Sequence, residues 1–166
     1  KLYEFRSSLN VSPIGLINDD IVAIMEGKLE VYNFRTGKSV QSFKDPMLVL
    51  EKPLHNCCIA CHSSGDLVAY SRDKENAVII LNYKTCEILH DVTVSDLNSV
   101  DAMTVSSSGL VFVAEYDGGP IVSFELTTGQ NMRQIVGGER VRMTSTLQAT
   151  PDAKYLAINM YQDVEV

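Results

Sequence analysis

The stretch that decides the fold is SVDAMTVSSSG at residues 99–109, which continues through short runs at 110–117, 121–128 and 133–136. Each run is rich in β-branched or aromatic residues and is bounded by Gly, Ser or Asp, as β-strands and their turns are. Elsewhere in the chain, no window keeps the i, i+3, i+4, i+7 apolar spacing of an amphipathic helix. The sequence therefore predicts an all-β chain.

The same stretch recurs along the chain. HSSG (62–65), SSSG (106–109) and TPDA (150–153) occupy matching places, and each follows the one before by 44 residues. A second element recurs between these turns, in which a large apolar residue is followed by Asn or Glu and then by Thr-Gly or Thr-Cys. Its copies are residues 31–38, 80–87 and 123–130, with a weaker copy, LYEFRSS, at residues 2–8. A repeat of about 40–45 residues indicates units that bury their faces only by stacking on their neighbours.

This unit resembles the WD-repeat β-propeller, whose blades have four antiparallel strands. The likeness covers nearly the whole chain but is divergent, because the chain contains no Trp. Three pairs stand where that family has Trp-Asp, namely Tyr32-Asn33, Leu81-Asn82 and Phe124-Glu125. The resemblance implies one propeller segment. It consists of a blade tail at residues 1–11, blades at about 12–43, 52–94 and 98–137, and an incomplete blade at 140–166.

The first of these blades is short for four strands. Tyr3 and Tyr32 hold equivalent places but lie only 29 residues apart, whereas the later turns recur every 44 residues. A stretch of 29 residues is too short for four strands of the later kind. Either this blade has lost a strand, or residues are absent between Val11 and Gly15.

The ends of the sequence favour a segment of a larger propeller. The chain begins without Met and stops at Val166 inside a run that has the composition of a strand. The alternative is that residues 1–11 supply a closing strand to the last blade. A lone segment with an open apolar edge is expected to dimerise or aggregate.

The charge balance is acidic, with 14 Lys plus Arg against 21 Asp plus Glu and a net charge of −7. Without a basic cluster the chain is a poor candidate for binding a phosphate backbone, so no nucleic-acid partner is expected. No apolar run approaches the ~20 residues of a membrane-spanning helix, so no membrane partner is expected either.

The cysteines indicate a reducing compartment. They lie at positions 57, 58, 61 and 86, and three of them fall within five residues. A disulfide framework usually spreads its cysteines through a short secreted chain. We therefore expect reduced thiols and a cytoplasmic location.

Cys58-Ile-Ala-Cys61-His62 has the Cys-x-x-Cys-His spacing of haem c attachment. On a strand, Cys58 and Cys61 face opposite sides, so both cannot reach one haem. We interpret them as small buried hydrophobic residues, with His62 in a turn. Zinc would need a second ligand pair beside Cys57 and these residues, and none lies nearby in sequence.

Thr36-Gly-Lys-Ser39 is similar to the end of a phosphate loop, but Tyr32 stands where the loop needs its first Gly. The repeat makes this segment a turn between strands. No catalytic, cofactor-binding or metal-binding residue is predicted.

The candidate partner-binding residues lie on one rim of the expected propeller, where the connections leave the second and fourth strands of each blade. Exposed Tyr and Arg beside turn acids are typical of interfaces. The predicted residues are Arg72, Asp73, Tyr116, Asp117, Tyr161 and Asp163.

The resemblance implies a non-catalytic scaffold for protein–protein interaction, within a larger multidomain protein or complex. Its partner would be a protein or peptide, and the acidic balance favours one with a basic surface. One alternative is an enzymatic or metal-binding propeller that uses channel-lining residues, for which Cys57, Asp101 and Ser145 are the inferred positions. A second alternative is a purely structural element of a large assembly.

Overall fold

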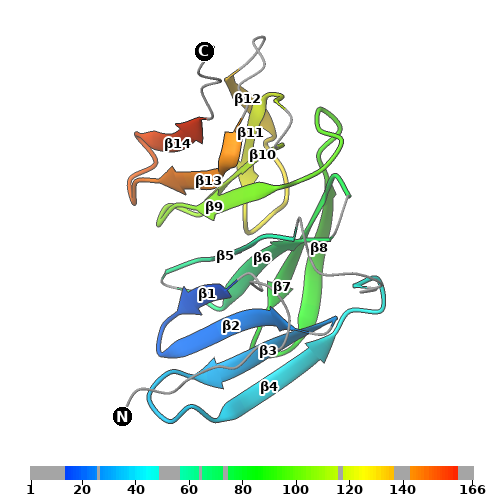
Figure 1. Cartoon of the computed structure of the whole chain (residues 1–166), viewed down its shortest axis with the longest axis vertical. Coiled ribbons are helices and arrows are strands. Elements are labelled where there is room, and N and C mark those ends of the chain that lie inside the picture. Colours follow the sequence, from blue (N-terminus) through cyan, green and yellow to red (C-terminus); the bar gives the residue numbers. More distant parts are fainter. Residues whose placement is uncertain are drawn as a thin grey trace, which may run out of the picture.

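The computed structural model describes residues 14–25, 27–48, 57–63, 65–72, 75–115, 118–136 and 143–160. All regular elements in these ranges are β-strands, and they form three four-stranded antiparallel sheets and one hairpin (Figure 1). In each sheet, strands that are consecutive in sequence are neighbours. The chain is all-β, and its sheets are consistent with propeller blades.

The first sheet contains β1 (Ile14–Ile17), β2 (Asp20–Met25), β3 (Lys28–Asn33) and β4 (Ser39–Lys44). The second contains β5 (Ile59–Cys61), β6 (Leu67–Ser71), β7 (Ala77–Asn82) and β8 (Glu87–Thr93). The third contains β9 (Ala102–Val105), β10 (Leu110–Ala114), β11 (Ile121–Glu125) and β12 (Arg133–Val136), and the hairpin contains β13 (Met143–Ala149) and β14 (Leu156–Met160).

The first sheet has all four strands, so the alternative in which this blade has lost a strand is wrong. Its registers pair Ile17 with Asp20 and Met25 with Lys28, which leaves only two residues for each connection. Two-residue hairpin turns need a backbone with positive φ, and Asn18 supplies it at 54°. Four strands therefore fit within a shorter stretch than the later sheets use.

The recurring turns at 62–65, 106–109 and 150–153 are structurally equivalent. In each, the N–H of the fourth residue donates to the carbonyl of the first, over 3.5, 3.0 and 2.9 Å in turn. Each turn connects the first strand of a sheet or hairpin to the second. The repeat read from the sequence is therefore a repeat in structure.

The Thr-Gly turns are also equivalent. A polar residue at the end of the third strand accepts a hydrogen bond from the turn in each sheet, namely Asn33, Asn82 and Glu125. The left-handed position of the turn is held by Gly37, Cys86 and Gly129, at φ of 66°, 58° and 65°. The segment 36–39 connects β3 to β4, which confirms its interpretation as a turn.

Apolar side chains fill the space between successive sheets. The core between the first and second sheets includes Val22 and Leu29 from one and Tyr70 and Leu81 from the other. Equivalent cores lie between the second and third sheets and between the third sheet and the hairpin. The innermost strands also contact one another in order, β1 with β5, β5 with β9 and β9 with β13.

Alternation along the inner strands confirms the predicted faces. Cys58 packs on the core between the second and third sheets, whereas Cys61 packs on the core between the first and second. Met103 faces the second sheet, and its neighbour Ala102 faces the hairpin. The inner strands of the second and third sheets are thus apolar on both sides because a neighbouring sheet or the hairpin covers each side.

Candidate functional site

The predicted rim is formed by the connections that leave the second and fourth strands. Its described residues are 27 between β2 and β3, 45–48 after β4, 72 and 75–76 between β6 and β7, 94–101 between β8 and β9, and 115 and 118–120 between β10 and β11. We refer to these residues as the predicted rim.

One of the six predicted partner-binding residues falls among the described residues. It is Arg72, which directly follows β6. The other five lie outside the described residues; they are Asp73, Tyr116, Asp117, Tyr161 and Asp163. Their role in partner binding stays a prediction.

The expected exposure of Arg72 is wrong, because its side chain is only 10% exposed. Its Nε donates to Asp45 Oδ2 over 3.0 Å, and Asp45 itself is 1% exposed. Its Nη1 lies 3.3 Å from Asp91 Oδ2 and 3.6 Å from Glu75 Oε2. The guanidinium is therefore directed into the protein, where it joins the end of the first sheet to the second.

Asp45 is the centre of this network. Its Oδ2 also accepts a 2.8 Å hydrogen bond from the hydroxyl of the fully buried Tyr70, and its Oδ1 accepts the N–H of Met47 over 2.9 Å. Both carboxylate oxygens thus have partners. A buried carboxylate needs such partners to remain charged.

The pKa values reflect this balance. Burial opposes ionisation of Asp45, but the hydrogen bonds from Met47, Arg72 and Tyr70 outweigh it and lower the carboxyl pKa. Burial and the hydrogen bond to Asp45 raise the pKa of the Tyr70 hydroxyl. Burial also opposes the charge of Arg72, but its hydrogen bond to Asp45 more than offsets this and raises the guanidinium pKa. The Asp45 carboxylate and the Arg72 guanidinium therefore both stay charged near neutral pH and form an ion pair.

Two further contacts fix the backbone of the predicted rim. The N–H of Val94 donates to the carbonyl of Asn76 over 2.7 Å, which joins the two connections of the second sheet. The backbone and side-chain amides of Asn98 each donate to the carboxylate of Glu115 over 3.1 Å. These bonds join the connection between β8 and β9 to the residue that follows β10. The predicted rim is thus braced within and between sheets.

Carboxylates dominate the described surface of this rim. Glu75 of the rim and Asp91, which lies beside it on β8, are 39% and 53% exposed, although both lie near Arg72. Asp96 of the rim is also exposed. The only described cation in this cluster is Arg72, which Asp45 neutralises. The surface between the second and third sheets is therefore acidic, and it can attract a cationic group.

Sequence reasoning missed Asp45 and Asp91. Both contact Arg72 from elements distant in sequence, at separations of 27 and 19 residues. The available signal was Arg72 itself, which directly follows the largely apolar stretch Leu67–Tyr70 and Ser71. A buried Arg at that place needs a carboxylate partner.

Two of the three inferred channel-lining positions, Cys57 and Asp101, have described side chains. Cys57 packs against the core between the first and second sheets. Asp101 Oδ2 accepts the hydroxyl of Ser99 over 2.9 Å. The side chain of Ser145 lies outside what the structure describes. No three His, Cys, Asp or Glu in the described ranges come together as metal ligands.

The thiols of the haem-like motif are poorly reactive. Burial raises the pKa of both Cys58 and Cys61 to about 12. All four cysteines are free thiols. His62 lies in the turn that the repeat predicts, and its Nε2 is 3.2 Å from the carbonyl oxygen of Ser107 in the next sheet. A thiol that stays protonated is a weak nucleophile and metal ligand.

Comparison with known proteins identifies no family. No protein-family model matches the chain. No curated protein matches it either. In the described residues, no helix has the length and apolar character to cross a membrane.

Proposed function

We propose that the chain is a divergent WD-repeat-like propeller segment that acts as a non-catalytic platform for a protein or peptide partner. Its place would be the cytoplasm, within a larger multidomain protein or complex. The observation that carries this proposal is the acidic surface of the predicted rim. Glu75 and Asp96 expose carboxylates there, and Asp91 of β8 exposes one beside Glu75, on a backbone held by inter-strand contacts.

The chemistry of the partner follows from this charge. Exposed carboxylates on a fixed backbone favour Lys or Arg side chains of a basic segment. Acidic groups that are already paired internally contribute less, and Asp45 is therefore a support and not a contact. The raised thiol pKa of Cys58 supports a binding role over a nucleophilic one.

A binding titration tests the proposal. A labelled Lys/Arg-rich peptide should bind the chain, and a Glu-rich peptide of equal length should not. Raising the ionic strength from about 0.01 to about 0.15 M shortens the Debye length from ~30 to ~8 Å, so binding should weaken. Binding that is unaffected by salt would contradict an electrostatic rim.

A matched pair of variants locates the site. Glu75→Gln with Asp96→Asn removes two charges from the predicted rim. Asp66→Asn with Asp152→Asn removes two from exposed turns of the opposite rim. Exposed pairs contribute about 0.2–1 kcal/mol each, so the first variant should bind roughly twofold to thirtyfold more weakly. Equal losses in both variants would show a diffuse charge effect and not a site.

A further inference from the structure

Each four-stranded sheet carries a row of three side chains on the face toward the unit that follows it. The row crosses the second, third and fourth strands, whose registers place its members opposite one another. The rows are Val22, Val31 and Gln41 in the first sheet, Ala69, Ile80 and His90 in the second, and Phe112, Ser123 and Arg133 in the third. In the first two sheets, the first two members of the row belong to the core shared with the next sheet. The three rows are equivalent places in the repeat.

In the first two sheets, the last residue of the row binds the next sheet. Nε2 of Gln41 donates to Cys86 Sγ over 2.9 Å. Nε2 of His90 lies 2.9 Å from the carbonyl oxygen of Thr127 and donates to it, because a carbonyl oxygen only accepts. Cys86 and Thr127 both lie between the third and fourth strands of the next sheet. The row therefore ends on a donor that binds this turn of the following unit.

Arg133 has the same place in the third sheet. Within the described ranges, the following unit consists of β13 and β14, so it contains no turn between a third and a fourth strand. Nor does any hydrogen bond or ion pair join Arg133 to another residue of these ranges. A guanidinium has several N–H donors and a permanent charge, and it binds carboxylates through two parallel hydrogen bonds. An acceptor on an added segment would complete the third row as the first two are completed.

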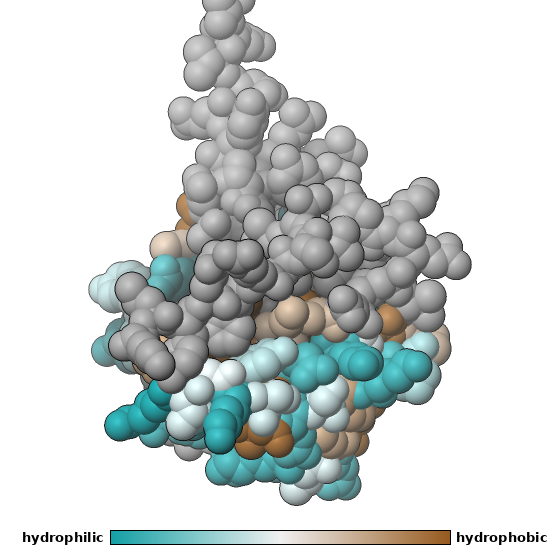
Figure 2. Space-filling view, turned by 60° about the horizontal axis from the view of Figure 1, so that its bottom comes forward, coloured by the Kyte–Doolittle hydropathy of each residue, from teal (hydrophilic) through white to brown (hydrophobic). Residues whose placement is uncertain are grey.

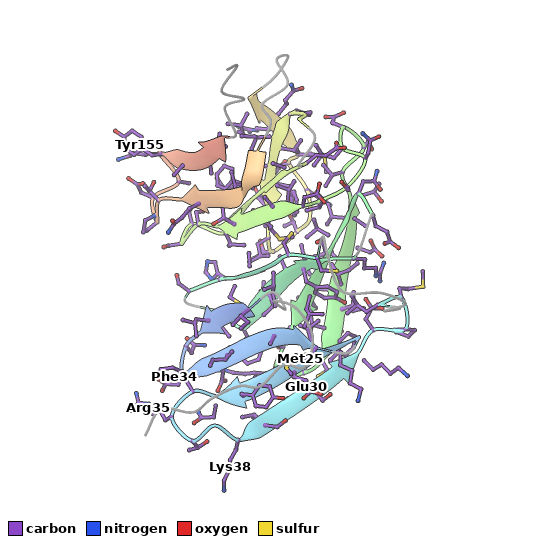
Figure 3. All side chains as sticks on the ribbon, in the orientation of Figure 1. Met25, Glu30, Phe34, Arg35, Lys38 and Tyr155 are labelled. Carbon is purple, nitrogen blue, oxygen red and sulfur yellow. The ribbon has the colours of Figure 1, made fainter. Side chains whose placement is uncertain are left out.

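A groove of about 370 Å³ lies beside Arg133, between the third sheet and the hairpin. All three members of the third row line it, together with Ile135 and Tyr155. Ile135 is 49% exposed. Tyr155, at the outer end of the hairpin, is 73% exposed (Figure 3). The groove is therefore open to a segment that arrives from outside.

The middle residue of the third row makes this groove deeper than the equivalent spaces. The first two sheets have aliphatic side chains there, Val31 and Ile80, which are 3% and 0% exposed. Ser123 is equally buried at 4%, but its side chain is smaller than either. Because protein interiors are close-packed, the volume that the serine leaves favours a large side chain from an added segment. An aromatic ring is the largest apolar group that a segment can offer.

The hairpin presents an edge to such a segment. Within the described ranges β14 pairs only with β13, whereas its equivalents β2, β6 and β10 each pair on both sides. In the complete sheets, the strand on the other side packs over the third strand of the sheet before it, as Ile79 and Leu81 of β7 pack with Val31 of β3. A strand added to β14 would therefore lie over β11, where Ser123 lines the groove.

The first sheet also exposes apolar side chains, among them Ile14 and Leu16. Figure 2 brings this end of the molecule forward and shows apolar patches among hydrophilic side chains on its described part. Apolar side chains scattered in this way are normal on a protein surface. The groove beside Arg133 is the stronger docking site, since the repeat itself indicates what covers it.

We propose that the groove binds an extended, acidic segment of a partner protein, which adds to β14 as a strand. Backbone hydrogen bonds to the strand edge would supply affinity, and side chains at alternate positions would supply specificity. An aromatic side chain of the segment sits on Ser123. A carboxylate in the turn that ends the segment binds Arg133, in the place where Cys86 and Thr127 accept from Gln41 and His90.

The charges around the groove favour an acidic segment. The carboxylate of Glu125 is already engaged, because Asn131 donates to one oxygen over 2.6 Å and Thr128 to the other over 3.0 Å. Lys154 adds a second cation to the lining, although Asp152 lies 3.4 Å from its Nζ. This site is therefore separate from the acidic rim in place and opposite to it in charge.

Fluorescence anisotropy of a labelled peptide tests the proposal. The probe has Ile, Phe and Leu at alternate positions, Thr between them and Asp-Gly-Asp at its end, and the control peptide ends in Asn-Gly-Asn. The 166-residue chain should bind the acidic probe more tightly. A chain that binds neither peptide, or both equally, would overturn the proposal. A Lys/Arg-rich peptide should not displace the probe, so failure here is distinct from failure of the rim.

A matched pair of charge variants locates the carboxylate. Arg133→Gln should weaken the acidic probe roughly twofold to fivefold, as expected for an exposed ion pair, and should leave the control peptide unchanged. Lys38→Gln removes one positive charge at the opposite end of the molecule from Tyr155 and should change neither affinity (Figure 3). Equal effects of the two substitutions on the acidic probe would refute a carboxylate site at Arg133.

A second substitution tests the aromatic side chain. Ser123→Ile gives the third row the residue that the second has, Ile80, and fills the groove. It should weaken the Phe probe about tenfold or more and leave an otherwise identical probe with Ala for Phe nearly unchanged. An unchanged far-UV circular dichroism spectrum would show that the sheet still folds. If Ser123→Ile affects the Phe and Ala probes alike, the aromatic side chain does not sit on Ser123.

Discussion

Replacing Asp45 by Asn removes the negative charge that Arg72 meets in the interior while preserving the shape of the side chain. The single amide oxygen of Asn can still accept the N–H of Met47, which lies 2.9 Å from Asp45 Oδ1. An NH2 group then replaces Oδ2, which accepts the hydrogen bonds of Tyr70 and Arg72 over 2.8 and 3.0 Å. What is lost is the charged partner of a guanidinium that is only 10% exposed.

The expected cost follows from burial. Removing one member of a buried pair costs about 3–5 kcal/mol, since it leaves an uncompensated charge. Here Arg72 retains Asp91 at 3.3 Å and Glu75 at 3.6 Å, so the low end of about 3 kcal/mol is expected. For a chain of this length that corresponds to a fall in the unfolding midpoint of roughly 6–12 °C.

The assay is urea and thermal unfolding followed by circular dichroism, with Asp19→Asn as the matched control. Asp19 pairs with Arg35 at 3.1 Å, but the two side chains are 62% and 74% exposed. The control should therefore cost less than about 1 kcal/mol. If Asp45→Asn lowers the free energy of unfolding by no more than Asp19→Asn does, burial does not explain the contribution of the Asp45–Arg72 pair to stability.

Three further outcomes follow from the same contacts. The pKa of the Asp45 carboxyl is lower in the folded than in the unfolded protein. The ionised carboxylate therefore stabilises the fold fully above the unfolded pKa near 3.9, and this stabilisation is lost as the pH falls through the folded pKa. In Asp45→Asn, the free energy of unfolding should consequently depend less on pH in the acid range. Gly129→Ala should cost at least about 1 kcal/mol in urea unfolding, because the φ there is +65° and the new Cβ would lie 2.8 Å from Val92 Cγ2. Cys58 and Cys61, whose pKa values are about 12, should resist iodoacetamide at pH 8 in the native protein and react once urea unfolds it, and rapid native labelling would contradict their burial.

Local chemistry explains what the sequence could predict. The turns at 62–65, 106–109 and 150–153 are built from hydrogen bonds within a few residues, so their equivalence is visible as an interval. Strand alternation placed Cys58 and Cys61 on opposite faces for the same local reason.

Non-local contacts explain what it could not predict. The prediction that Arg72 is exposed is wrong because its partner Asp45 lies 27 residues away, directly after the last strand of another sheet. The strand thought lost from the first sheet is present because two-residue turns, with Asn18 in a left-handed conformation, shorten the chain that four strands need. The prediction took one repeat length for every blade, but the first two connections between strands are shorter in the first sheet than in the later ones.

The most direct test of rim binding is to map the contact of a Lys/Arg-rich peptide by amide chemical shifts on isotope-labelled protein. Binding at the predicted rim should shift the amides of residues 94–98, together with those of Arg72, Glu75 and Glu115. The turns at 62–65 and 106–109 lie on the opposite rim and should not move. Shifts confined to those turns, or spread evenly over both rims, would contradict the proposed site.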